Sequence, residues 1–361
     1  MRKNLFATTP GIIIVGAVIG LIAVWLQKLG NPANMGICVA CFERDVAGGL
    51  GLHRAAIVQY LRPEIMGLVL GSLAAAIATR EFKPRGGSAP IVRFVLGMIA
   101  AMGALVFLGC PWRAILRLAG GDGNAILGLA GLATGIWFGT LFFKKGYSLG
   151  RSNSQSVVSG ALFPVIAVCL LLLYLIFPQI PAQPQSGPLF YSVKGPGSQH
   201  APFIASLGLA FIIGIFAQRS RFCTMGAFRD LFLFRYTHLF LGLAAMFAAA
   251  FIANALTGGL KFGFEGQPVA HSDFLWNYLG MVTAGLAFAL AGGCPGRQLF
   301  MAGEGDSDAG IFALGMLVGA AMAHNLGTAS SGTGIGVYGM QATILGFAVC
   351  LIIGFVHSKK A

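Results

Sequence analysis

The sequence predicts an all-α polytopic membrane protein with about ten spanning helices, four re-entrant hairpins and two inverted five-helix repeats. Three observations favour this class: the composition, the length of the apolar runs and a cysteine motif that occurs twice. Of the 361 residues, 57% are apolar and only 10% are charged, and the mean hydropathy is +0.81. These values lie far outside the range of soluble domains. The runs do not alternate as outer-membrane strands do, so spanning helices are the simplest interpretation.

Ten apolar runs approach the roughly 20 residues that cross a hydrocarbon core. The first follows a basic N-terminus and resembles a signal peptide, but no convincing cleavage site follows it, so we interpret it as a span. The ten spans are predicted at residues 11–27, 64–79, 94–109, 125–143, 157–177, 203–217, 238–256, 276–291, 309–326 and 340–356.

Some segments between these spans are too polar or too short to cross the membrane. We predict that they are re-entrant, entering and leaving on one side: 31–50, 110–123, 219–235 and 292–306. The 53 glycines agree with this prediction, because glycine in membrane helices is typical of close packing or broken helices.

The distribution of Lys and Arg predicts the orientation. With the N-terminus in the cytoplasm, sixteen of these residues lie on the cytoplasmic side and eight outside. The longest loop, 178–202, carries a single Lys, as an external connector should. We therefore expect a protein of the bacterial cytoplasmic membrane with both termini in the cytoplasm. The formal charge of +13 reports this topology, and we expect no nucleic-acid partner.

An internal repeat is the most informative pattern. The segment Cys38-Val-Ala-Cys-Phe-Glu-Arg-Asp45 aligns with Cys223-Thr-Met-Gly-Ala-Phe-Arg-Asp230. Cys110-Pro-Trp-Arg113 aligns in the same way with Cys294-Pro-Gly-Arg297, and each is followed by a Gly-Asp pair. Chance is a poor explanation for four matched segments at nearly equal spacing.

The predicted span count fixes how the copies are related. Five spans separate each segment from its copy, and an odd number puts the copies on opposite faces of the membrane. We expect residues 1–180 to form one repeat, 181–202 an external linker and 203–361 the inverted second repeat. Transporters built this way bind their substrate near the midplane, between broken helices.

The repeated Cys-Pro-x-Arg units suit an anion. Proline favours the first turn of a short helix, whose free N–H groups and positive dipole end attract anions. The arginines add full charges, and a thiol offers a weak donor and a polarizable surface that suits a sulfur- or selenium-rich anion. We predict a substrate path lined by Cys38, Cys110, Cys223, Cys294, Arg113 and Arg297.

Further arginines flank the first-half segments and would make the external mouth electropositive, which concentrates anions. They are Arg44, Arg54, Arg62 and Arg117. The alternative is that these arginines form ion pairs with Glu43, Asp45, Glu64 or Asp122, or contact lipid headgroups. The sequence leaves both interpretations open.

A membrane thiol oxidoreductase or sulfur-transfer enzyme is the alternative to a transporter. Cys38 and Cys41 have the spacing of a redox pair, and arginines with helix N-termini make thiols more acidic. A single-sided enzyme has no obvious use for the repeat, so we expect no enzyme. The six histidines are dispersed without metal-binding spacing, and we expect neither a metal nor a cofactor.

The four repeated segments resemble those of the YeeE/YedE family of bacterial membrane proteins, and most closely the branch described as selenium transporters. The resemblance covers nearly the whole chain. It implies an hourglass shape, uptake of a small inorganic anion such as thiosulfate, and central cysteines that hand the ion along, namely Cys38, Cys110 and Cys294. It also implies a cytoplasmic partner, a small sulfur-carrier protein of the TusA type.

Overall fold

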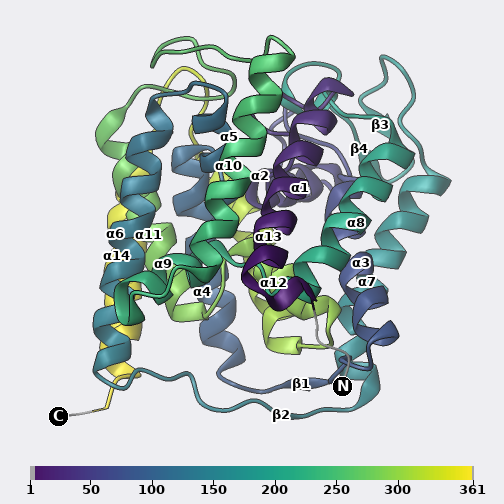
Figure 1. The fold of residues 1–361 in the computed structure, drawn as a ribbon. Coiled ribbons are helices and arrows are strands. Elements are labelled where there is room, and N and C mark those ends of the chain that lie inside the picture. The colour runs from purple at the N-terminus through teal and green to yellow at the C-terminus, as the bar shows by residue number, and fades with distance from the viewer. Residues whose placement is uncertain (1–4, 360–361) are drawn as a thin grey trace.

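The computed structural model describes residues 5–359 and folds them into a bundle of roughly parallel and antiparallel helices (Figure 1). Ten of its helices coincide with the ten predicted spans: α1 (Thr9–Lys28), α3 (Pro63–Ala78), α4 (Pro90–Phe107), α6 (Asn124–Lys144), α7 (Val157–Ile176), α8 (Phe203–Ser220), α10 (His238–Leu256), α11 (Phe274–Ala291), α13 (Ser307–Asn325) and α14 (Gly339–Val356). Within the described range, nine helical segments are long and apolar enough to cross a membrane, and α3 is a shorter apolar helix of 16 residues. The all-α polytopic membrane architecture is confirmed.

Four shorter helices occupy the segments that were predicted to be re-entrant: α2 (Val39–Gly49), α5 (Pro111–Ala119), α9 (Thr224–Phe234) and α12 (Pro295–Gly303). They contain 9 to 11 residues each, too few to cross a bilayer at the rise of an α-helix. The remaining elements are small: η1 (Leu5–Ala7), η2 (Pro196–Ser198), and the strands β1 (Arg85–Gly86), β2 (Asn153–Ser154), β3 (Gln185–Ser186) and β4 (Leu189–Phe190).

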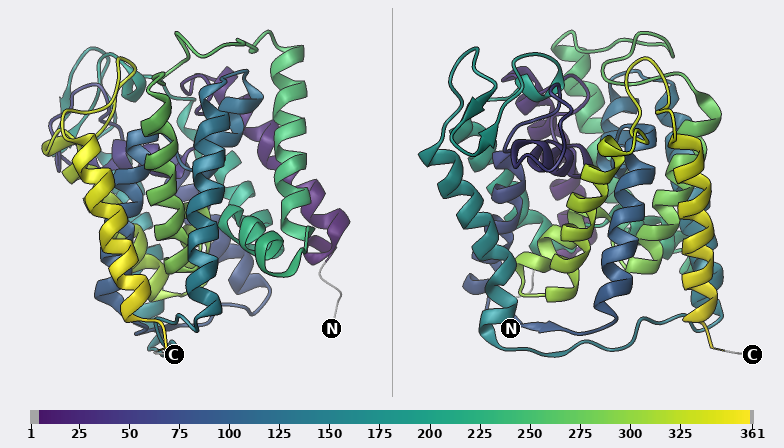
Figure 2. Two further views of the ribbon diagram at one scale, coloured as in Figure 1. Left: turned by 90° about the vertical axis from the view of Figure 1, so that its left-hand side faces the viewer. Right: turned by 180° about the vertical axis from the view of Figure 1, so that it is seen from behind.

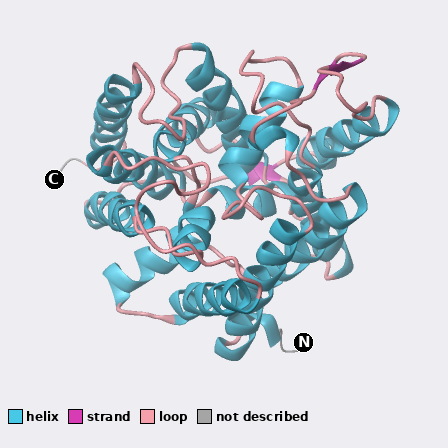
Figure 3. Cartoon of the chain, turned by 90° about the horizontal axis from the view of Figure 1, so that it is seen from above, coloured by secondary structure: helices cyan, strands magenta, loops and turns pink. Residues whose placement is uncertain are grey.

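The two ends of the bundle are distinct. The start of α1, the end of α14 and the antiparallel pair β1–β2 lie at one end, and the pair β3–β4 lies at the other (Figure 1). Helices α2 and α5 lie in the half of the molecule away from the chain ends, whereas α9 and α12 lie in the half near them (Figure 2). Seen from above, the spanning helices point toward the viewer and loops cross over them (Figure 3).

Helix packing joins the first part of the chain to the second. The closest pairs are α1 with α10, α3 with α8, α4 with α13 and α6 with α11, and α4 and α11 also pack against each other. In each of the four pairs a glycine faces a backbone carbonyl of the other helix, where a Cβ atom would lie 1.9 to 2.2 Å from the oxygen: Gly16, Gly71, Gly97 and Gly131. Only glycine allows so close an approach.

Backbone hydrogen bonds also occur in matched sets. The loop before α4 bonds to the turn after α12, with 2.9 Å from Lys83 N to Glu304 O. The loop before α11 bonds in the same way to the turn after α5, with 2.9 Å from Lys261 N to Gly120 O. The glycines that follow, Gly121 and Gly305, both have a φ of +95°. The two parts of the chain therefore repeat the same local geometry.

The correspondence does not extend to the last helix of each part. Helix α7 packs mainly on α3 and also touches α12 and α13, whereas α14 packs on α11 and α4. A strict twofold relation would give α7 and α14 equivalent neighbours. The outermost helices therefore break the symmetry of the bundle.

Candidate functional site at four cysteine-capped helices

Each of the four repeated cysteines occupies the N-cap of a short helix. Cys38 caps α2, Cys110 caps α5, Cys223 caps α9 and Cys294 caps α12. At two of these caps the sulfur accepts a backbone N–H of the first turn, at 3.4 Å for Cys38 and 3.2 Å for Cys223. The positive dipole ends of four helices therefore meet at four thiols.

The cysteines form two neighbouring pairs. The amide of Cys110 donates to the sulfur of Cys38 at 3.5 Å, and the two thiols interact. Cys223 and Cys294 interact in the same way. All four are buried and free of disulfides. We call these the first pair (Cys38 and Cys110) and the second pair (Cys223 and Cys294). Cys41, which has no counterpart in the second half, also lies against Cys38.

Trp112 connects the two pairs. It lies two residues after Cys110, and its ring packs against Phe222, which precedes Cys223, with 5.8 Å between ring centroids. It also packs against Phe300 of α12 at 5.9 Å, and it lies against Gly296. A buried indole next to the first pair therefore packs against residues that neighbour the second pair in sequence.

Several buried polar atoms near the pairs have no hydrogen-bond partner among the described residues. They are Trp112 Nε1, Thr224 Oγ1 and Gln298 Oε1, and each side chain is almost fully buried. An unpaired buried polar group is costly, so these three atoms are candidate contacts for a ligand. Ten other buried side-chain atoms of the described residues also lack a partner, so it is their position next to the pairs that singles these three out. The sequence analysis did not identify these three residues. The difference between Trp112 and Gly296 in the aligned motifs was the available signal for one of them.

Arg113 is fully buried, and the structure gives it a largely structural role. No carboxylate pairs with it among the described residues, yet its donors are occupied. Nη1 lies 3.5 Å from the sulfur of Cys41, and the guanidinium donates to the carbonyls of Asn34, Leu108, Pro268 and Val269. Arg113 thus links the turn between α4 and α5 to one loop of the first half and one loop of the second half. Its positive charge remains beside the first pair.

Arg297 has different surroundings from Arg113. Its Nη1 lies 3.3 Å from the carboxylate of Glu304, which also pairs with Arg221 at 2.8 Å and Arg85 at 3.5 Å. Arg85 also pairs with Asp306 at 2.7 Å and Arg221 with Glu81 at 3.1 Å, so carboxylates compensate most of this positive charge. We call Glu304 and its three arginines the Glu304 cluster, which follows α12 in the half of the bundle near the chain ends.

The predicted electropositive mouth needs correction. Arg44 and Arg62 are buried and share the carboxylate of Asp45, at 2.8 and 2.7 Å. Arg117 is also buried and pairs with Asp122 at 2.6 Å. These three arginines therefore form ion pairs, as the alternative interpretation expected. A desolvated guanidinium group inside a protein needs a compensating charge.

Arg54 is the member of that set with an exposed side chain, and it lies over the ring of Phe190 at 4.6 Å. Glu64 was a candidate ion-pair partner for these arginines, but its carboxylate accepts hydrogen bonds from Asn31 and Ser206. An open mouth lined by four free arginines is therefore not present in the structure.

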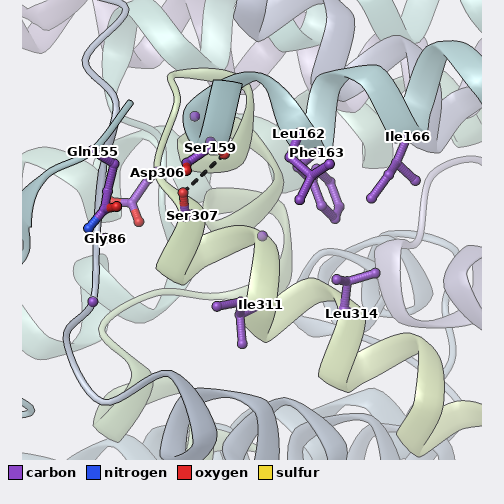
Figure 4. A pocket seen from close by; sticks show the side chains of 13 residues that line it. Gly86, Gln155, Ser159, Leu162, Phe163, Ile166, Asp306, Ser307, Ile311 and Leu314 are labelled. Carbon is purple, nitrogen blue, oxygen red and sulfur yellow. Dashed lines mark hydrogen bonds between the residues drawn. The ribbon is translucent and has the colours of Figure 1, made fainter. Parts of the chain in front are cut away.

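The described residues contain no group of three or more His, Cys, Asp or Glu that could hold a metal ion. A groove of about 320 Å³ runs between α7 and α13 (Figure 4). Its polar end includes Asp306 and Ser307, whose hydroxyl donates to Ser159 O at 3.2 Å, and its other end is lined by apolar residues such as Leu162 and Ile311. None of the four cysteines lines this groove.

Comparisons with known proteins give two findings. Residues 219–355 match a family model described as sulphur transport, and this range includes the second pair. A stretch of 106 residues is 32% identical to the thiosulfate transporter TsuA of Spirochaeta thermophila. That stretch is 29% of this chain and 32% of the relative, so the chain matches about a third of the length of that protein.

Proposed function

We propose that this chain is a member of the YeeE/YedE sulphur transport family and that it moves a small sulfur-containing anion across the membrane. The observation that carries the proposal is the meeting of two buried thiol pairs at four helix N-termini inside a multi-pass bundle. A thiosulfate-type anion is the substrate class that this arrangement suits best.

The chemistry of the site supports movement without covalent change. Helix N-termini supply N–H donors and a positive potential to an anion whose hydration shell is lost. Thiols supply weak donors and a soft surface for a terminal sulfur atom. The anion passes from the first pair to the second, and the unpaired groups of Trp112, Thr224 and Gln298 lie near this route.

The direction follows from the proposed topology. We propose that the chain ends face the bacterial cytoplasm, so the first pair is reached from outside and the second from inside. Residues 1–180 and 203–361 then form two repeats related by a twofold axis in the membrane plane, with α2, α5, α9 and α12 as re-entrant elements. The matched backbone hydrogen bonds of the two parts support this relation.

Two finer points rest on the sequence resemblance. A selenium-containing anion of the same charge and softness is the competing substrate. On the cytoplasmic side, a small sulfur-carrier protein of the TusA type is the proposed acceptor.

Uptake into proteoliposomes tests the function. Purified protein should take up labelled thiosulfate, measured beside selenite and selenide, and the accumulated anion should be chemically unchanged. Cys350→Ala serves as the matched control, since Cys350 is also a buried free cysteine but lies on α14. Recovery of a reduced or desulfurated product would favour the thiol enzyme instead. Absence of uptake for all three anions would overturn the proposal.

A further inference from the structure

The two Cys-Pro-x-Arg units differ in the residue between proline and arginine. The first has Trp112 and the second has Gly296. The two positions meet in the structure: a Cβ atom on Gly296 would lie 3.2 Å from Cζ2 of the indole. The ring of one half therefore occupies the space that an equivalent side chain of the other half would need. Two large side chains would not fit there at native packing density.

The indole lies between residues of the two halves that are close in sequence to the two pairs. Trp112 is 1% exposed, follows Cys110 by two residues, and contacts Phe222, which precedes Cys223, and Gly296, which follows Cys294 by two residues. The aromatic rings of Phe222 and Phe300 hold it from two sides. The ring is therefore held by packing against side chains of the second half.

The indole N–H is the second, independent observation. Nε1 has no acceptor among the described residues although the ring is buried. A buried tryptophan N–H normally finds a partner, because it has lost its water. A donor without a partner in the first turn of α5, two residues after Cys110, fits an anionic acceptor.

We propose that Trp112 is the barrier between the two thiol pairs and a specificity-determining donor to the passing anion. At rest its ring separates the pairs. During passage the ring moves aside and Nε1–H donates a hydrogen bond to an oxygen of the anion. The donor role rests on the proposed transport function, whereas the barrier role rests on packing alone.

Two substitutions separate these roles. Trp112→Phe keeps an aromatic ring and removes the N–H, so KM for thiosulfate should rise roughly tenfold, the loss expected for one hydrogen bond to a charged group, without any leak. Trp112→Ala removes the ring, so vesicles containing an iodide-quenched dye should become permeable to iodide. Trp137→Ala, at a 45% exposed position on α6, is the control and should change neither measurement.

Binding can be followed directly on Trp112 itself. The chain has four tryptophans, and replacing Trp25, Trp137 and Trp276 by Phe leaves Trp112 as the sole indole emitter. Thiosulfate should shift its emission to longer wavelength as Nε1–H gains an acceptor, and sodium chloride at equal ionic strength should not.

The outcomes distinguish this inference from the proposed function. If wild-type protein takes up no sulfur anion, the proposed function fails and the donor role with it, while the iodide leak still decides the barrier role. An unchanged KM in Trp112→Phe overturns the donor role. Vesicles that contain Trp112→Ala and remain impermeable to iodide overturn the barrier role. Size-exclusion chromatography checks folding, and Trp112→Leu replaces the alanine variant if that one does not fold.

Discussion

The four N-cap cysteines hold a position that helices usually give to Ser, Thr, Asp or Asn. Sulfur is a weaker acceptor than oxygen, so the thiols of Cys38 and Cys223, which accept a first-turn N–H, give poorer caps than serine would give. Cys110 and Cys294 make no side-chain cap hydrogen bond. Cysteine at these four positions therefore adds little to helix stability, and the gain must be a property that oxygen lacks. The polarizable sulfur surface is that property in the proposed function.

Serine substitution separates capping from transport. Cys38→Ser and Cys223→Ser should leave thermal stability unchanged or raise it by about 1 kcal/mol, because the hydroxyl replaces a sulfur that already accepts a first-turn N–H. Thiosulfate uptake should fall by roughly tenfold, since the soft contact is lost. Thermal unfolding in detergent and proteoliposome uptake measure the two effects, with Cys350→Ala as the control. Full uptake in both serine variants would contradict a role for the thiols.

Arg113 leads to the opposite expectation. Its guanidinium joins carbonyls of both halves, and the single ammonium of lysine cannot replace that fork. Arg113→Lys should lower the free energy of unfolding by about 3 kcal/mol, because buried acceptors lose their donors. The measurement is thermal unfolding of the purified variant. A variant with wild-type stability and only a raised KM would instead mean that Arg113 binds the anion directly.

Sequence reasoning named the partners but could not choose between two interpretations. Arg44, Arg62 and Arg117 flank or lie inside the first-half re-entrant segments, so an electropositive mouth and ion pairs with residues such as Asp45 and Asp122 were both open. Their true neighbours depend on tertiary folding: Arg62 reaches Asp45 across 17 residues of chain. Charge type is visible in a sequence, whereas pairing requires the fold.

The helices were predicted well from the length of the apolar runs and from the residues that begin and end helices. All ten predicted spans and four short segments appear as helices, with ends shifted by a few residues. Helix α4, for example, begins at Pro90 rather than near residue 94, because proline suits the first turn. Arg93 is tolerated there since its guanidinium donates to Ser88 and to Ala291 O.

Close helix contacts depend on particular glycines. Gly71 of α3 faces Phe211 O, where a Cβ atom would lie 2.0 Å away, while Gly208 on the partner helix α8 has open space. Gly71→Ala should destabilise the fold by about 1 to 3 kcal/mol through overpacking. Gly208→Ala should stabilise it by up to about 1 kcal/mol, since alanine is the better helix former. Thermal unfolding of the two variants should give opposite signs; equal shifts would show that the α3–α8 contact is not tight.

The arrangement of the whole molecule was predicted only in part. The odd number of spans between copies predicted that they lie on opposite sides, and α2 and α9 do lie in opposite halves of the bundle (Figure 2). The different packing of α7 and α14 could not be read from the sequence. Both helices are strongly apolar with few polar residues, and nothing in their pattern says which neighbours they meet.

Topology can be tested with two exposed loop positions. In a Cys169→Ala background, Val193→Cys should react with a membrane-impermeant maleimide in intact cells, because the loop after α7 is expected outside. Arg151→Cys should react only after the membrane is opened, since the loop after α6 is expected inside. Both side chains are exposed in the structure. Labelling of both from the same side would contradict the proposed span count.

The pairing of α1 with α10, α3 with α8, α4 with α13 and α6 with α11 has a mechanical consequence. The closest helix pairs cross from one half of the chain to the other, so the two sequence halves cannot swing apart as separate rigid lobes. Alternate opening to each side by swinging lobes is therefore disfavoured, and conduction should depend on small side-chain displacements. Preloading vesicles with unlabelled thiosulfate should then leave the initial rate of labelled influx unaccelerated, in contrast to an obligate exchanger.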